Sequence, residues 1–186
     1  MSLAWVNIQT ALQSWLSTAS GISSGSVGWA KQPGSVQPPM PYATLRITRV
    51  KTLGFDDEQQ LEYDGTRPNG QEIRRSTIGQ REFVLELHAY SASTIGADAA
   101  AAVLSDAVDS LGLLENVYAF ETAGFCVFDW GDVLDVSGVL ETAFQGHATV
   151  EINCRTLSSV EEYFGYIASI GLVDDVTEPD GSPIPE

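Results

Sequence analysis

The sequence predicts an α+β fold, with a mostly antiparallel sheet, helices packed on one face and a projecting β-hairpin arm. Two observations carry this prediction. Segments with helical periodicity and segments with alternating apolar and polar residues both occur, and the alternating segments follow one another closely, which favours antiparallel pairing. Hydrophobic residues make up 44% and charged residues 18% of the 186 residues, a composition that supports a packed core.

Two segments have the apolar spacing of helices that bury one face. Residues 3–18 carry large apolar side chains every three or four positions, and residues 94–112 carry an alanine-rich apolar stripe suited to packing on a sheet. A shorter helix is predicted over residues 158–170. The apolar positions of the three segments are Trp5, Ile8, Leu12, Trp15 and Leu16, then Ala100, Val103, Leu104, Ala107, Val108 and Leu111, and finally Val160, Tyr163 and Ile167.

The predicted arm comes from two long strands that bracket a turn-rich stretch. Alternation predicts strands over residues 42–51 and about 73–90, and residues 52–70 between them are rich in Gly, Asp and Pro. Antiparallel pairing of these strands predicts a hairpin arm over about 46–82.

Two further strands are predicted over residues 124–136 and 139–155. The elements together predict one domain over residues 1–170 and an acidic, Pro-containing tail over 171–186. No uncharged apolar run reaches about 18 residues, so no membrane span is expected. No basic segment followed by an apolar stretch opens the sequence, so no signal peptide is expected either.

Charge is distributed unevenly along the chain, whose net charge is -16. Residues 1–81 hold eight of the nine bases and six acids, a net of +2, whereas residues 82–186 hold one base and nineteen acids, a net of -18. Binding of nucleic acid through its phosphates needs a basic surface, which the second part cannot supply. An acidic surface instead suits a protein past which DNA must slide.

The sequence contains no recognisable catalytic, metal or cofactor motif. His88 and His147 stand at polar-facing strand positions, and their spacing to Cys126 and Cys154 matches no zinc pattern. Phosphate-binding loops and nucleophile elbows are missing. We therefore predict a protein without catalytic residues, metal or cofactor. The alternative is a hydrolase that uses paired acids, for which Asp129 and Asp132 are the candidates.

Seven bases cluster on the predicted arm and offer the clearest functional signal. They form a solvated ribbon that discourages aggregation, or an interface that docks on the acidic body of the next copy, or a DNA-binding patch. We favour the two protein-based interpretations over DNA. The interface candidates are Arg46, Arg49, Lys51, Arg67, Arg74, Arg75 and Arg81, and the candidates for an acidic lumen or acceptor surface are Asp129, Asp132, Asp135 and Glu151.

A family resemblance rests on ordered short matches between about residues 5 and 170. After Trp29, the segment Pro38-Pro39-Met40-Pro41-Tyr42-Ala43-Thr44-Leu45-Arg46-Ile47 resembles the opening of neck and tail terminator proteins of contractile-tailed phages. Shorter resemblances follow in the same order at residues 54–58, 135–140, 148–152 and 162–167. Departures are the sparse bases after residue 81 and the acidic tail.

This resemblance implies a fold similar to the tail terminator of lambda-like phages. It also implies a homo-oligomer, a hexameric ring, that terminates the tail tube and joins it to the head connector. Expected partners are the tail tube, the sheath, the connector proteins and genomic DNA that passes through the lumen without specific binding, with no membrane involved. The protein is then expected in the virion neck after assembly in the bacterial cytoplasm. The alternatives are a head-completion or connector adaptor and an acidic mimic of DNA.

Overall fold

The computed structural model describes residues 5–30, 37–68, 70–93, 95–96, 98–140 and 143–165. Three α-helices and seven strands occur in this part of the chain. The helices are α1 (Trp5–Ser20), α2 (Ala100–Asp109) and α3 (Leu114–Ala123). The strands are β1 (Val27–Trp29), β2 (Tyr42–Tyr63), β3 (Ile73–Ser91), β4 (Phe125–Trp130), β5 (Leu134–Asp135), β6 (Gly138–Leu140) and β7 (Ala143–Phe164).

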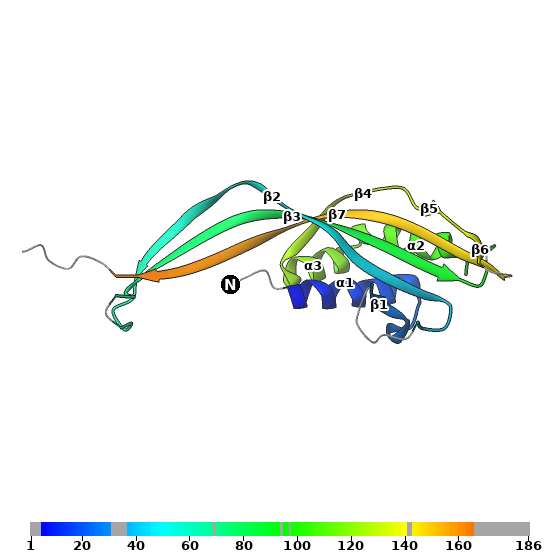
Figure 1. Ribbon diagram of the computed structural model, residues 1–186, viewed down its shortest axis with the longest axis horizontal. Helices are drawn as coiled ribbons and strands as arrows, with labels where there is room; N and C mark the ends of the chain where they lie inside the picture. Colours follow the sequence, from blue (N-terminus) through cyan, green and yellow to red (C-terminus); the bar gives the residue numbers. More distant parts are fainter. Residues whose placement is uncertain are drawn as a thin grey trace, which may run out of the picture.

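The strands form a twisted sheet whose main order is β1-β2-β3-β7-β4, with β5 and β6 also paired to β7. Only β1 and β2 pair in parallel; the other described pairs are antiparallel. All three helices lie on the same side of this sheet (Figure 1). The predicted fold class is therefore confirmed. The uncovered side of the sheet is called the open face below.

The core lies between the helices and the half of the sheet that they cover. Alternate residues of the central strands point toward the helices, and Leu45, Leu87 and Ile152 among them are fully buried. Leu12 of α1 and Leu104 of α2 pack against this layer and are equally buried. Burial of each such side chain contributes about 1.5–3 kcal/mol, so this layer holds the fold together. None of the described helices is both long and apolar enough to cross a membrane.

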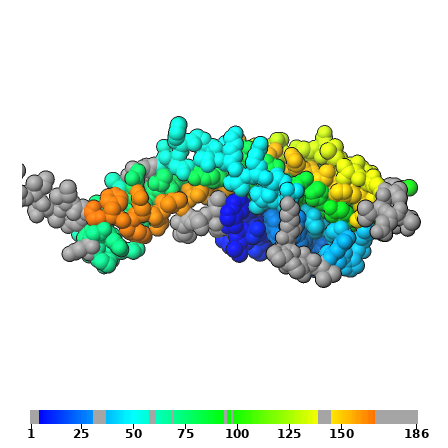
Figure 2. All heavy atoms as spheres, in the orientation of Figure 1, coloured from blue at the N-terminus to red at the C-terminus, as the bar shows by residue number. Residues whose placement is uncertain are grey.

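An arm of three strands, rather than two, projects beyond the helices. The register places Tyr63 of β2 opposite Ile73 of β3, and Ile73 opposite Phe164 of β7. We define the arm as residues 49–82 and 155–164. It forms a narrow projection from the thicker body (Figures 1 and 2). The predicted hairpin thus exists, and the distal half of β7 completes it as a third strand.

Two parts of the fold differ from the expectation. Residues 158–164, predicted to be helical, continue β7 and pair with residues 73–79. These residues form a strand because the edge of β3 needs a partner, and this pairing outweighs the weak helical periodicity of so short a segment. Helix α3 is missing from the prediction because only Phe120 of its apolar residues is buried.

Residues 166–170, the rest of the predicted final helix, lie outside the described residues, and so does the tail over 171–186. The division of the chain into a domain and a tail therefore stays a prediction.

Candidate functional site

The arginines of the arm are held by carboxylates of the same chain. Arg81 donates hydrogen bonds of 2.6 Å to each carboxylate oxygen of Asp56. This bidentate pair lowers the pKa of Asp56 and raises the pKa of Arg81. Arg74 binds Glu62 on β2 and lies 3.8 Å from Glu161 on β7. These guanidinium groups therefore join strands of the arm to one another.

The remaining predicted interface bases also lie near acids. Arg75 is 3.2 Å from Glu162. Arg67 is 3.5 Å from Asp64, and its guanidinium carbon lies 4.2 Å from the centre of the Tyr163 ring. Nearer the body, Arg46 is 3.8 Å from Glu86, Arg49 is 3.9 Å from Glu82, and Lys51 stands opposite Glu82 in the β2–β3 register. Arg155, which is not among the predicted bases, is also 3.6 Å from Glu82.

The arm is consequently close to neutral instead of basic. Its residues, 49–82 and 155–164, contain seven bases and nine acids, a net of -2. Antiparallel pairing does bring the predicted bases onto one ribbon, as expected. However, β7 brings Glu161 and Glu162 from the acidic half of the sequence onto the same ribbon. Contact between these bases and a neighbouring copy stays a prediction.

Three of the four predicted acceptor acids line the open face. Asp132 and Glu151 line a hollow of about 260 Å³ together with Glu86. Asp129 accepts a hydrogen bond of 3.2 Å from the side-chain nitrogen of Asn153. These carboxylates lie near the paired bases of the body, so the open face carries both signs of charge with acids slightly in excess.

Asp135, the fourth predicted acid, lies apart in a turn. Its Oδ1 accepts a hydrogen bond of 2.9 Å from the backbone nitrogen of Ser137 and a further bond from the Ser137 hydroxyl. These bonds lower the pKa of the Asp135 carboxyl. The carboxylate therefore has a local structural role at the start of the turn.

An aromatic and histidine cluster on the open face is a feature that the sequence did not reveal. The rings of Tyr42 and Tyr90 stack at 4.6 Å, and those of Tyr90 and His147 stack at 4.4 Å. Nδ1 of His88 lies 3.1 Å from Nε2 of His147, and Nε2 of His88 lies 3.4 Å from Glu86. Burial and the neighbouring His88 lower the pKa of His147. In the sequence, strand alternation places both histidines at polar-facing positions. Only the register of β3 with β7 shows that the two histidines are neighbours.

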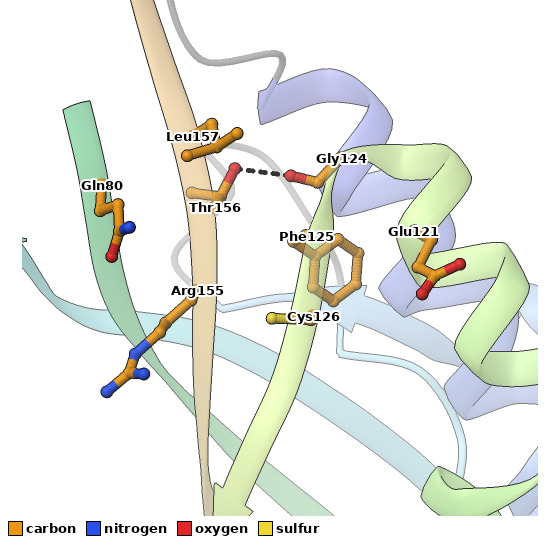
Figure 3. A pocket seen from close by; sticks show the side chains of 8 residues that line it. All are labelled: Gln80, Glu121, Gly124, Phe125, Cys126, Arg155, Thr156 and Leu157. Carbon is orange, nitrogen blue, oxygen red and sulfur yellow. Dashed lines mark hydrogen bonds between the residues drawn. The ribbon is translucent and has the colours of Figure 1, made fainter. Parts of the chain in front are cut away.

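A cavity of about 450 Å³ opens at the sheet edge where β4 begins (Figure 3). Phe125 and Leu157 line it, and the hydroxyl of Thr156 donates a hydrogen bond of 2.7 Å to the carbonyl of Gly124. Cys126 also lines it and is exposed. The cavity marks the point where β4 stops covering the edge of β7, and it is mostly apolar.

The described residues offer no arrangement that fits a metal centre or a nucleophile with its base. No group of three His, Cys, Asp or Glu side chains in this part of the chain is placed to hold a metal ion. The two histidine rings are hydrogen-bonded to each other. Among the described hydrogen bonds, neither ring bonds to the side chain of a serine or cysteine. Cys154 is buried, which raises the pKa of its thiol. What the arrangement offers instead is a projecting arm and a sheet face with paired charges, both suited to contact with other macromolecules.

Comparison with known families gives a match over nearly the whole chain. A family model described as phage neck terminator protein matches residues 6–181. The match runs from α1 through β7 and thus includes the body and the arm. No curated protein matches the sequence.

Proposed function

The chain belongs to the phage neck terminator family, and from this we propose that it forms a ring at the neck of a tailed-phage virion. The ring ends the tail tube, joins it to the head connector and lets genomic DNA pass through its lumen. Six copies are expected from the resemblance to tail terminators. The family description supports a structural role in the phage neck, and the ring, the lumen and the connector contact are the proposal.

The pairing of charges on the open face supports the proposal that this face lines the lumen through which DNA passes. Arg46 pairs with Glu86, and Arg49 and Arg155 share Glu82. A guanidinium that already has a carboxylate partner releases few counterions when a phosphate passes, so its attraction for DNA is weak. A channel lined by this face would therefore neither grip DNA nor carry the large positive field of a DNA-binding protein.

The predicted contact between arm and neighbour is part of the same proposal. Arg46 and Arg49 are 46% and 63% exposed, and their ion pairs of 3.8 and 3.9 Å are long. Such exposed pairs contribute little to the stability of a single subunit. We infer that these bases and Lys51 reach acids such as Asp129 or Glu151 of an adjacent subunit as secondary contacts that set register rather than strength.

A binding experiment separates a terminator from a head-completion adaptor. Purified full-length protein is mixed either with tail tubes or with portal-connector complexes, and bound protein is measured after sedimentation. Because a terminator must cap the tube, we expect saturation at one ring per tube end. Binding to the connector alone, with free tube ends, would reassign the protein as an adaptor.

The acid-pair hydrolase gains no support from the arrangement of its candidate residues. Asp129 is hydrogen-bonded to Asn153, and Asp132 lines a shallow hollow on the open face.

A further inference from the structure

The side of the arm that continues the core-facing side of the sheet carries large, solvent-exposed apolar side chains on either side of the Arg75–Glu162 ion pair. The register places Val50 opposite Phe83, whose side chain is fully buried in the core. Further out on β3, every second residue points to this same side. The large apolar residues found there, called the arm underside, are Val50, Leu61, Tyr63, Val160 and Phe164, each between 38% and 62% exposed.

A second uncovered apolar surface lies on α3. Phe120 faces the core, where it packs on Trp15 at 5.8 Å and on Phe125 at 4.9 Å. Tyr118 is rotated by about 200° from Phe120 at 3.6 residues per turn, and Leu114 lies one turn before Tyr118. The α3 patch consists of Leu113, Leu114 and Tyr118, each between 50% and 64% exposed.

Grouped, exposed residues of this size mark contact surfaces more often than free solvent-facing surfaces. The arm underside and the α3 patch together contain eight of the 17 exposed large apolar residues among the described residues. We propose that the arm underside of one subunit packs on the α3 patch of the next subunit in the ring. This inference rests on the proposed ring and names the surfaces that would close it.

The charges beside the two patches favour a second copy as the occupant. Residues 98–123, which include α2 and α3, contain five acids and no Lys or Arg. On the arm underside, Arg75 stands beside Leu61 in the register and is 3.2 Å from Glu162, an exposed pair that Glu115 of the next copy could join. On α3, Glu115 directly follows Leu114. Contact between the patches would thus bring a guanidinium toward an otherwise acidic helical layer. Two unlike patches on one chain make a head-to-tail contact, which closes into a ring when the rotation allows it.

The arm is long enough to make this contact. Ten residues of β3, Ile73–Glu82, extend beyond Phe83, which gives about 33 Å at about 3.3 Å per residue. This length is comparable with the width of a small domain, about 30 Å. The arm can therefore reach across a neighbouring body while its base remains in its own sheet.

Thiol cross-linking tests the contact directly. All variants carry Cys126→Ser, because Cys126 is exposed whereas Cys154 is buried. The test chain adds Leu61→Cys and Leu114→Cys, and the control chain adds Leu61→Cys and Ile95→Cys, since Ile95 is 86% exposed and lies outside α3. With a short bismaleimide, the test chain should give a ladder of bands that ends at the ring number, and the control chain should stay monomeric.

Light scattering before cross-linking tests the ring separately from the contact between the arm underside and the α3 patch. A ring whose test chain cross-links no more than the control overturns the arm–α3 contact and leaves the ring intact. A chain that stays monomeric at high concentration and in the presence of tail tubes overturns both proposals. Independently, the double variant Leu114→Ser with Tyr118→Ser should lose the ring but keep the circular dichroism spectrum of the folded chain, whereas Ile95→Ser should retain the ring. A ring that survives the double variant would also overturn the contact.

Discussion

His88 and His147 share a hydrogen bond of 3.1 Å between Nδ1 and Nε2 on the open face of the sheet. One ring must donate its proton to the other, so the bond requires that the accepting nitrogen be unprotonated. Glu86 faces His88, Asp135 lies on the side of His147, and the Tyr90 ring stacks on His147. The cluster therefore ties the C-terminal end of β3 to the start of β7 only while at least one imidazole is neutral.

Acidification should weaken the protein through this pair. The folded-state pKa of His147 is lowered, so the unfolded chain binds more protons below its own pKa of about 6.5, and stability is lost as the pH falls through that value. We expect the melting temperature to drop between pH 7.5 and 5. In His147→Gln the drop should be smaller, because the titrating group is gone.

The carboxylates respond in a lower pH window. The pKa values of Asp56, Asp64 and Asp135 are lowered by their hydrogen bonds, so their contribution to stability is present above about pH 3.9 and is lost below it.

Parallel melting profiles of the wild type and His147→Gln between pH 7.5 and 5 would mean that the histidine pair does not cause the loss of stability in this pH range.

Removal of the paired acids should turn the open face into a DNA-binding surface. Glu82→Gln combined with Glu86→Gln leaves Arg46, Arg49 and Arg155 without their carboxylate partners. We expect the affinity for duplex DNA to rise. The logarithm of this affinity should fall with the logarithm of the salt concentration, with a slope of about -0.9 per contacted phosphate. Fluorescence anisotropy at 50 and 200 mM salt measures this.

A matched control changes the same number of charges elsewhere. Glu115 and Glu121 lie exposed on α3, and their replacement by Gln should leave DNA affinity unchanged. Equal binding by both double variants would show that net charge, and not the open face, determines the attraction.

Gly146 should not tolerate a side chain. A Cβ at this position would lie 2.6 Å from the carbonyl oxygen of Ser93 and 3.1 Å from that of Ser91. Backbone atoms at these distances must shift, so Gly146→Ala is expected to cost about 1–3 kcal/mol. Gly138→Ala, where no atom lies within 4 Å, is the control and should change the free energy of unfolding by less than about 0.5 kcal/mol. Urea unfolding monitored by circular dichroism compares them, and equal midpoints would contradict the close approach.

The two thiols should differ sharply in reactivity. Cys126 is exposed beside the cavity at the start of β4, whereas Cys154 is buried and its pKa is raised. Because the thiolate is the reactive form, a maleimide should label the native protein once per chain and the urea-unfolded protein twice. Mass spectrometry counts the labels, and double labelling of the native protein would show that β7 is not packed as described.

The elements that could be predicted from the sequence are those whose apolar residues repeat regularly along one buried face. The alternation around Leu45 and the stripe around Leu12 each follow one buried face, and both residues are fully buried. The distal half of β7 could not be predicted, because Glu161 and Tyr163 become strand residues through pairing with residues 74 and 76, more than 80 positions away. Helix α3 was hidden because its apolar residues Leu114 and Tyr118 face outward.

In the candidate site, too, local features could be predicted from the sequence and long-range contacts could not. Grouping of the bases on one ribbon followed from two strands adjacent in sequence. Their neutralisation did not, since Arg74 meets Glu161 only through the third strand. The contact of His88 with His147 likewise depends on the β3–β7 register. Long-range pairing therefore decides the charge of the arm.

Self-association is the central claim, and the mass of the purified full-length protein in solution tests it most directly. Light scattering should report a closed assembly, and for six chains of 20.0 kDa a mass of about 120 kDa, with ring-shaped particles in negative stain. A monodisperse 20.0 kDa species that persists at high concentration and in the presence of tail tubes would contradict the account.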